Sequence, residues 1–339
     1  MKVELLKLLR EKKDFISGQE LSRSLGVSRT AIWKQMQALR KAGYRINAVP
    51  HRGYELCESP DVYSGEEIKS RLGTKWLGRE LFFYETTDST NLRAKEYGDN
   101  EGKAGALFIS EFQERGRGRR GRDWECPTGA GIIFSVLLRP EILPEKAPSL
   151  TLVMALSAAN AIRDTLHLDV RIKWPNDLLI NKKKICGILT EMSCERDYIH
   201  HVVIGVGINV NQREIPPELN KSATSLFLES SKKTDRTALL NGVLERFEKN
   251  YEVFMETGDL IKLKDEYERL LYNVGKPVRI TGKMDIKEGQ REDNNDDFFE
   301  AEALGITNTG ELMVRTSDGN TINVNAGEVS VRGLEGYAS

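Results

Sequence analysis

The alternation of apolar and polar positions divides the chain into three parts. Up to about residue 60, three segments carry apolar residues at helical spacing, and two short alternating segments follow them. Ser28 can cap the third helix, and Gly26 makes the tight turn before it. Two short helices across such a turn, followed by a β-hairpin, predict a winged helix-turn-helix domain over residues 1–60.

The middle of the chain mixes buried strands with helices. Residues 106–110 and 131–138 are apolar runs of strand length, and residues 149–166 have the period of a helix. A further run of strands between residues 170 and 206 is joined by short turns, which indicates antiparallel pairing. We expect a mixed α/β domain over residues 64–274.

Short strands dominate the last part of the chain. Five of them occur within residues 275–335, and Asp318-Gly319 is a hairpin turn. Their number and length predict a small closed β-barrel. Residues 287–297 form an acidic, polar insertion and are expected to be a mobile hairpin tip. The fold class is therefore multidomain α+β.

Charge is unevenly distributed along a chain whose net charge is only -1. No Asp or Glu occurs between Glu20 and Glu55, whereas seven Lys and Arg residues lie in that interval. Such a basic surface is typical of a domain that binds a polyanion. The four cysteines form no paired motif, and the chain has no signal-type segment or apolar stretch long enough for a membrane. We expect a soluble, cytoplasmic protein with no membrane partner.

The second helix of the helix-turn-helix motif would read DNA. The side chains opposite its apolar face are of the types that contact phosphates and base edges. Its N-cap residue and one residue of the wing are of the same types. A winged helix that docks protein is the alternative, but the absence of acids favours DNA. The candidate DNA-binding residues are Ser28, Arg29, Thr30, Trp33, Lys34, Gln37 and Arg52.

An arginine- and glycine-rich loop is the most informative segment. Between Arg115 and Arg122 there are five arginines and three glycines, and the loop joins two buried strands. Arginine offers planar, bidentate donors to carboxylate and phosphate, so the loop is a candidate lid over an acyl-phosphate reaction. A solvated surface loop is the alternative. The Gly-x-Gly-x-x-Gly spacing also matches a dinucleotide motif, but the breaker-rich segment after it cannot open a helix.

Four further segments carry polar or small residues at the ends of strands. The segment 87–91 offers hydroxyls and an amide for a neutral polar group, although it could be a simple helix cap. The segment 173–177 is suited to a nucleotide or its magnesium, although it could be an ordinary turn. The segments 184–189 and 205–209 place glycines within or at the end of buried strands, where a ligand can approach closely.

These five segments occur in the order seen in biotin–protein ligases. The quoted motifs are Thr87-Asp88-Ser89-Thr90-Asn91, Gly116-Arg117-Gly118-Arg119-Arg120-Gly121-Arg122, Lys173-Trp174-Pro175-Asn176-Asp177, Lys184-Ile185-Cys186-Gly187-Ile188-Leu189 and Gly205-Val206-Gly207-Ile208-Asn209. The whole chain resembles the bifunctional bacterial type, with a winged-helix repressor domain, a ligase domain and a C-terminal SH3-like barrel. The family commonly has alanine at the position of Cys186.

The resemblance implies an enzyme that activates biotin with ATP and Mg²⁺ as biotinyl-5′-AMP. The acceptor would be a lysine of the biotin carboxyl carrier protein of acetyl-CoA carboxylase, or of other biotin-dependent carboxylases. The adenylate would also act as corepressor, by favouring a homodimer that binds operator DNA. A lipoate or octanoyl ligase and a purely DNA-binding sensor are the rival functions.

The roles of individual residues follow from the resemblance and from charge. The catalytic candidates are Lys184, Arg117 and Arg119, whose charges can stabilise the developing phosphate charge. The biotin-binding candidates are Ser89, Thr90, Asn91, Gln113, Gly116, Arg117, Gly118, Arg119, Lys184 and Gly187. The candidates for ATP and adenylate are Arg119, Arg120, Arg122, Trp124, Asn176, Asp177, Gly205 and Asn209, with Asp177 also near Mg²⁺.

Overall fold

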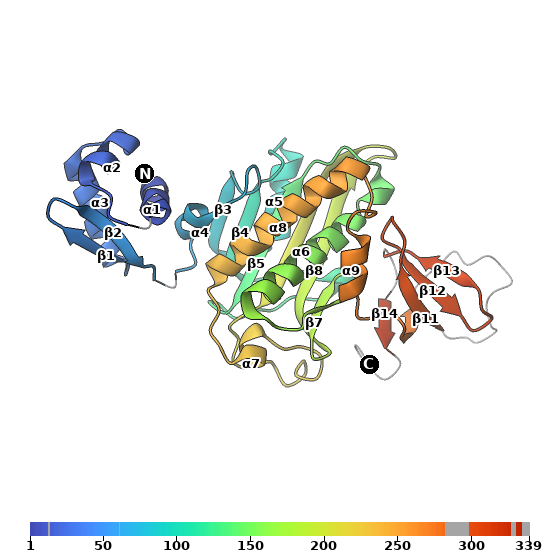
Figure 1. Cartoon of the computed structure of the whole chain (residues 1–339). Helices are drawn as coiled ribbons and strands as arrows, with labels where there is room; N and C mark the ends of the chain where they lie inside the picture. Colours follow the sequence, from blue (N-terminus) through green and yellow to red (C-terminus); the bar gives the residue numbers. More distant parts are fainter. Residues whose placement is uncertain (13, 61, 282–297, 327–329, 334–339) are drawn as a thin grey trace. The chain divides into compact units, whose positions relative to one another are not determined.

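The first part of the computed structural model is built on two serine-capped helices. Ser17 and Ser28 each accept a hydrogen bond from the backbone N–H three residues on, and Gly26 turns the chain between the two helices with φ +65°. The elements are α1 (Lys2–Glu11), α2 (Gly18–Leu25), α3 (Arg29–Lys41), β1 (Arg45–Val49), β2 (Gly53–Glu58) and α4 (Gly65–Arg71). The structure describes all of residues 1–339 except 13, 61, 282–297, 327–329 and 334–339 (Figure 1).

The apolar faces of α1, α2 and α3 form one core. Leu5, Leu21, Ile32 and Met36 have no exposed surface, and Ile46 of the antiparallel β1–β2 hairpin packs against the same cluster. A helix-turn-helix followed by a hairpin wing is therefore present, as expected.

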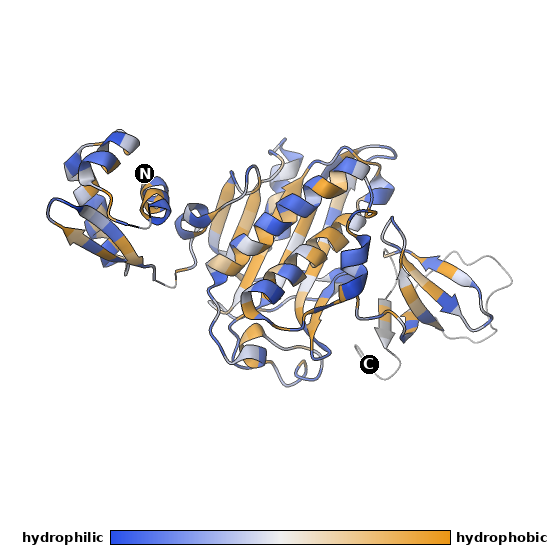
Figure 2. Ribbon diagram, viewed as in Figure 1, coloured by the Kyte–Doolittle hydropathy of each residue, from blue (hydrophilic) through white to orange (hydrophobic). Residues whose placement is uncertain are grey.

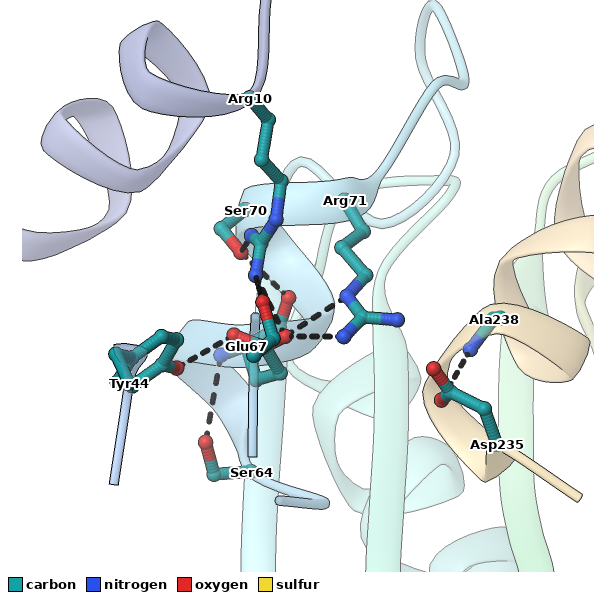
Figure 3. A network of polar contacts seen from close by, with 9 residues as sticks. Arg10, Tyr44, Ser64, Glu67, Ser70, Arg71, Asp235 and Ala238 are labelled. Atoms are coloured by element: carbon teal, nitrogen blue, oxygen red, sulfur yellow. Dashed lines mark hydrogen bonds and ion pairs between the residues drawn. The ribbon is translucent and has the colours of Figure 1, made fainter. Parts of the chain in front are cut away.

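Helix α4 belongs to this first unit, which extends over Met1–Gly73. Its Glu67 is fully buried and accepts hydrogen bonds at 2.7 Å from Arg10 and at 2.6 Å from the Tyr44 hydroxyl (Figure 3). Arg71 on the same helix contacts the same carboxylate at 2.7 Å. A buried carboxylate is tolerated only when it is paired in this way. The compact unit thus continues beyond residue 60, where the linker was expected.

The second unit is centred on a sheet of seven strands in the order β3-β4-β5-β9-β8-β7-β6. All neighbouring pairs are antiparallel except β3 and β4, which are parallel. The strands are β3 (Leu81–Thr87), β4 (Leu107–Gln113), β5 (Gly131–Leu138), β6 (Arg171–Lys173), β7 (Asp177–Ile180), β8 (Lys183–Cys194) and β9 (Ile199–Asn209). The antiparallel run between residues 170 and 206 is confirmed.

Helices lie on both faces of this sheet. The helices are α5 (Thr90–Asp99), α6 (Ser149–Leu166), α7 (Leu226–Ser230), α8 (Arg236–Thr257) and α9 (Lys264–Leu270), with short 3-10 turns η1 (Arg119–Gly121) and η2 (Pro144–Lys146). Asn91 of α5 bonds Glu191 on β8, whereas Thr151 of α6 bonds the adjacent Thr190. Because successive residues of a strand point to opposite faces, α5 and α6 cover opposite sides.

The sheet strands are apolar, and the helices that cover them are amphipathic. Figure 2 shows apolar strands beneath α6 and α8; α8 turns hydrophilic residues outward, whereas α6 is buried except near its C-terminal end. Phe134, Leu156, Ile204 and Phe247 are at most 1% exposed. Residues 258–263 form turns and bends between α8 and α9. No helix among the described residues is long and apolar enough to cross a membrane.

The C-terminal strands form a five-stranded antiparallel sheet in the order β13-β12-β11-β10-β14. The strands are β10 (Pro277–Thr281), β11 (Phe298–Ile306), β12 (Leu312–Thr316), β13 (Thr321–Val324) and β14 (Ser330–Gly333). Within the described residues β13 and β14 remain separate edges, so the expected closed barrel is not seen. The Asp318-Gly319 turn joins β12 to β13 as expected, and the acidic insertion 287–297 lies outside the described residues.

Candidate active site

The arginine-rich loop between β4 and β5 folds back on itself as a hairpin. Gly118 N–H donates to the carbonyl of Arg122 at 2.6 Å, and Trp124 N–H donates to that of Gly116 at 3.0 Å. Arg120 and Gly121 have φ +58° and +69°, which turns the tip. This hairpin lies over a narrow cleft on the α5 face of the sheet, lined by residues of α5, β8 and β9.

The hairpin brings two of its arginines to the cleft. Arg117 and Arg119 line it, whereas Arg120 and Arg122 are exposed and lie outside the lining. Arg119 donates to Asn176 Oδ1 at 3.0 Å and also to the carbonyl of Ala326, in the bend that follows β13. Burial lowers the pKa of Arg119, while the nearby Asp177 carboxylate opposes that shift. Of the candidate arginines in this loop, Arg117 and Arg119 line the cleft and Arg120 and Arg122 do not.

Lys184 lines this cleft and forms an ion pair with Asp177 behind it. Lys184 Nζ lies 2.6 Å from Asp177 Oδ1, on the neighbouring strands β8 and β7. The same ammonium lies 5.5 Å from the ring centroid of Trp124. A positive charge therefore stands beside Arg117 and Arg119 in the lining of the cleft, paired with one carboxylate.

Three glycines are required by the packing of Trp124. A Cβ on Gly207 would lie 2.3 Å from Trp124 Cε2, and a Cβ on Gly187 would lie 3.1 Å from Cζ3. Gly116 faces the carbonyl of Trp124, at 2.2 Å from such a Cβ. The register pairs Gly187 directly with Gly207, so the indole rests on a floor of bare backbone. Gly207 thus makes room for the indole, Gly187 for the Lys184 ammonium at 2.9 Å and the edge of the indole, and Gly116 for the backbone of Trp124.

Trp124 also fills much of the cleft. The free volume is about 50 Å³, whereas small-molecule sites usually have roughly 300–1,000 Å³. The indole Nε1 is buried and has no hydrogen-bond partner among the described residues. A ligand of ordinary size must therefore displace the indole or the hairpin.

The opposite end of the cleft has a polar floor. Gln113 Oε1 accepts hydrogen bonds from the backbone and hydroxyl of Thr90 at 2.7 and 3.0 Å. Ser135 Oγ lies 2.7 Å from Thr90 Oγ1 and 2.6 Å from Asn91 Oδ1. Ser89 and Thr90 are each 2% exposed. Such a floor suits a small neutral group that both donates and accepts hydrogen bonds.

Gly205 and Gly118 also belong to this cleft, but Asn209 does not. A Cβ on Gly205 would lie 2.1 Å from Asn91 Oδ1, so this glycine serves the polar floor. Asn209 donates to the carbonyl of Thr224 at 3.0 Å and accepts from Gln212 at the same distance. Its amide holds two loops together, and it is not among the residues that line the cleft.

Two residues behind the floor, Ser135 and Glu191, were not expected from the sequence. Ser135 is the single hydroxyl within the apolar strand 131–138, a polar interruption that could have been noticed. Glu191 accepts from Asn91 at 2.8 Å and from Lys95 at 3.0 Å. Burial opposes its charge, but these two donors outweigh it and hold the pKa of Glu191 below its usual range.

Asp177 is the candidate magnesium ligand. No group of three or more His, Cys, Asp or Glu within the described ranges could hold a metal by protein ligands alone. Mg²⁺ often uses one or two carboxylates together with substrate phosphates, and a single carboxylate next to the cleft-lining Lys184 fits that mode. The residues are compatible with a metal that arrives with a nucleotide.

The candidate DNA-binding residues lie on α3 and the wing. Arg29, Thr30, Trp33 and Lys34 are exposed, and Trp33 has 53% of its surface free. Gln37 is half-buried on the same helix, and the hydroxyl of Ser28 is used as the helix cap.

Arg52 of the wing is not isolated. Its NH2 lies 3.6 Å from Asp14, and its guanidinium lies 4.3 Å from the centroid of the Phe15 ring. A phosphate would have to compete with those two contacts.

Comparison with known families agrees with this architecture. Residues 83–209 match the Biotin/lipoate A/B protein ligase family, residues 3–55 match an HTH domain, and residues 274–332 match the Biotin protein ligase C terminal domain. The fold and cleft are therefore those of a ligase joined to a helix-turn-helix domain.

Individual relatives cover nearly the whole chain. The Bifunctional ligase/repressor BirA of Bacillus subtilis (strain 168) is 39% identical over 90% of this chain and 91% of its own. That of Escherichia coli (strain K12) is 32% identical over 95% and 94%. The structure of the biotin protein ligase from Aquifex aeolicus in complex with biotin and ATP has a TM-score of 0.63 at 31% identity, and covers 75% of this chain and 99% of that one. The chain belongs to the bifunctional biotin ligase/repressor family, which confirms the resemblance indicated by its five motifs.

Proposed function

We propose that this protein attaches biotin to a lysine of a biotin carboxyl carrier domain and represses biotin operons with the intermediate. The observation that carries the ligase half is the convergence of Lys184, Arg117 and Arg119 on one cleft whose far end is a polar floor. Biotin has the matching shape, with an anionic carboxylate at one end and a neutral ureido group at the other.

In the first step, a biotin carboxylate oxygen bonds to the α-phosphorus of ATP, and the bond to the bridging β-phosphate oxygen breaks. Pyrophosphate leaves and biotinyl-5′-AMP remains. Both reactants are anions, so their approach needs fixed positive charge, and Lys184, Arg117 and Arg119 supply it. A preorganised donor of this kind is often worth about 3–4 kcal/mol in the transition state. Mg²⁺ bound with the nucleotide would neutralise phosphate charge, with Asp177 as its protein ligand.

In the second step, the amine of an acceptor lysine attacks the carbonyl carbon of the mixed anhydride, and AMP leaves. The amine loses a proton as the amide forms. Water must be excluded meanwhile, because the anhydride hydrolyses. The hairpin and Trp124 cover the cleft and are suited to that task. The acceptors are the carrier protein of acetyl-CoA carboxylase and those of other biotin-dependent carboxylases.

The DNA-binding half rests on the exposed face of α3. Arg29, Thr30, Trp33, Lys34 and Gln37 would enter the major groove, with Arg52 at the backbone. Repression requires two such helices, and a homodimer bound to biotinyl-AMP would supply them. One support is β8, whose residues 189–194 pair only with β9 within the described ranges. An unpaired strand edge is a template for pairing with another chain.

The remaining assignments complete the proposal. Gln113, Ser89, Thr90, Asn91, Gly116, Gly118 and Gly187 would surround biotin, and Trp124, Asn176 and Gly205 would lie near the adenylate. The division into residues 1–60, 64–274 and 275–335 follows the three kinds of pattern, and the C-terminal strands would close as an SH3-like barrel. A cytoplasmic location suits these carboxylase and operator partners.

One assay tests the ligase against its rivals. Labelled biotin, ATP and a purified carrier domain are mixed with the protein, with lipoate as the competing substrate. Transfer of biotin without transfer of lipoate supports the proposal, because lipoate has no ureido group for the polar floor. Transfer of lipoate alone, or no transfer, would contradict it. Footprinting of operator DNA with biotin, ATP or both then tests the repressor half, for which protection should increase only with both.

A further inference from the structure

An ion pair outside the cleft holds the base of the arginine-rich hairpin. Arg236, the first residue of α8, places NH1 2.7 Å from Glu111 Oε2 and NH2 2.8 Å from Oε1. Only 9% of the Arg236 side chain and 12% of the Glu111 side chain are exposed. Two parallel N–H···O bonds are the strong geometry of an arginine–carboxylate pair. Neither residue lines the cleft.

This pair contacts the backbone on which the hairpin returns to β5. Arg236 NH1 also donates to the carbonyl of Gly131 at 3.0 Å, and Glu111 Oε2 accepts the N–H of Gly129 at 3.3 Å. Helix stability does not explain an arginine at this place, because a cation in the first turn of a helix opposes the macrodipole. The pair therefore serves the backbone that it contacts.

Other contacts fix the same leg of the hairpin. Asn211 N–H donates to the carbonyl of Ala130 at 2.6 Å. Gln212 Nε2 donates to the buried Cys126 Sγ at 3.2 Å. The returning leg, residues 126–131, is thus attached to β4, to α8 and to the segment that follows β9.

The outgoing leg is fixed in a different way. The N–H groups of Glu114 and Arg115 donate to the carbonyls of Thr87 and Asp88, each at 2.9 Å, and so extend the pairing of β3 with β4. Both legs are therefore anchored, and residues 116–125 lie between the anchors.

The segment between the anchors is the part that must move. Residues 116–125 close on themselves through backbone hydrogen bonds, so they can shift as one piece. The cleft beneath them has a free volume of only about 50 Å³. This piece must shift to admit a ligand, and it must then return to place Arg117 and Arg119 at the reactants. The accuracy of the return depends on the two anchors.

We propose that Arg236, paired with Glu111, is a positioning residue that fixes the returning leg, so that the arginines and Trp124 come back to one place over the bound reactants. This inference rests on the proposed function. Arg236 acts only through the backbone of the leg, because it lies outside the cleft. Placement matters steeply for rate, since a shift of about 1 Å caused by a distant change can cost on the order of 10²-fold.

Arg236→Met is the informative substitution because it keeps an unbranched side chain and removes the guanidinium. With the leg released, adenylation should slow by roughly 10–10²-fold. Water should also reach the anhydride more often, so the AMP formed per biotin transferred should rise several-fold. Arg246→Met is the matched control, because Arg246 lies on the same helix and pairs with Asp164 of α6. It should leave both quantities unchanged.

A double variant, Arg236→Met with Glu111→Met, separates positioning from stability. The single change leaves the Glu111 carboxylate without its partner, which is destabilising, whereas apolar replacement of both partners of a buried pair is often neutral. We expect the double variant to recover most of the unfolding temperature lost in Arg236→Met and still to form excess AMP. Recovery of the normal ratio of AMP to transferred biotin together with stability would make the pair purely structural and overturn the proposal.

Trypsin supplies a measurement that needs no reaction. The hairpin carries five arginines between Arg115 and Arg122, so cleavage there reports how often it leaves its place. Mass-spectrometric mapping of the full chain should show faster cleavage within residues 115–122 in Arg236→Met and in the double variant, with unchanged rates in the first unit. Equal hairpin cleavage in the unaltered protein and in Arg236→Met overturns the proposal, as does a uniform rise along the chain. Absence of biotin transfer by the unaltered protein would instead contradict the proposed function, and the trypsin result would stand apart from it.

Discussion

Two hydrogen-bonded carboxylates, the buried Glu67 and the half-buried Glu191, differ in where their networks end. Glu67 is fully buried, and its contacts with Arg10, Tyr44 and Arg71 all lie within the first unit. Glu191 stands at one end of a hydrogen-bond chain whose other end opens into the cleft. A hydrogen-bond network whose donors and acceptors are all used can only hold elements together. A network that reaches a cleft can also present a donor or an acceptor to a ligand.

The largest effect is expected at Lys184, which lines the cleft. Lys184→Met removes the cation beside the reacting centre, so kcat for adenylation should fall by roughly 10²–10³-fold. Biotin affinity should fall much less, because this charge matters most in the transition state. Pyrophosphate release and calorimetry measure the two quantities. Lys183→Met on the same strand is the control, and equal losses of binding and rate would reduce Lys184 to a ligand contact.

Glu67 should affect the stability of the first unit, where all of its described contacts lie. Glu67→Gln leaves Arg10 and Arg71 without their shared carboxylate, which should cost about 3 kcal/mol of unfolding free energy in the first unit. Urea unfolding of a segment comprising residues 1–73 measures this, and Glu66→Gln on the exposed side of α4 is the control. Biotin transfer by the full chain should be unchanged. A stable first unit, or a loss of ligase rate, would remove the distinction drawn between the two carboxylates.

Substitution of Gly207 tests whether the Trp124 indole requires a residue without a side chain beneath it. Gly207→Ala places a methyl group 2.3 Å from the indole, so the ring must move. We expect its fluorescence emission to shift toward that of an exposed indole and kcat/KM for ATP to fall about ten-fold, an effect of roughly 1.4 kcal/mol. Gly242→Ala on α8 is the control, because its new Cβ would meet nothing closer than 4.0 Å. Unchanged fluorescence would show that the indole does not need that surface.

His201 is a buried titratable group outside both hydrogen-bond networks. Its replacement is expected to give the smallest effect, which is on the pH dependence of stability. Both ring nitrogens lack a hydrogen-bond partner within the described residues, and the nearest Asp99 oxygen is 3.8 Å away. Burial lowers the pKa of His201, with smaller contributions from Arg139, Lys95 and His200, against the opposing charge of Asp99. The folded state therefore prefers the neutral ring.

The sign of the pH dependence follows from that preference. The stability from the neutral ring is fully present above the unfolded pKa of about 6.5 and is lost as the pH falls toward the folded value. The slope from this one group is at most about 1.4 kcal/mol per pH unit. Urea unfolding between pH 7.5 and 5.5 should be less pH-dependent in His201→Leu than in the unaltered protein. Equal slopes would show that another group is responsible.

Much of this molecule was predictable from local pattern. Serine caps, apolar periodicity and the turn at Gly26 depend on neighbours within a few residues, so the helix-turn-helix and most strands were correctly predicted. The kinds of residue that chemistry needs were also visible. A lysine before a strand glycine and a dense arginine loop between buried strands indicate an anionic ligand whatever the fold around them.

Only the tertiary structure decided which of those residues meet. Arg120 and Arg122 share the loop with Arg119 but lie outside the cleft, and the amide of Asn209 is used between two loops. Ser135 and Glu191 reach the site because β5, β9 and β8 pair in one register, and a shift of one residue would turn both to the other face. Register is fixed by contacts far apart along the chain. The sequence by itself therefore determined which chemical groups are present, and long-range strand pairing determined which of them meet at the cleft.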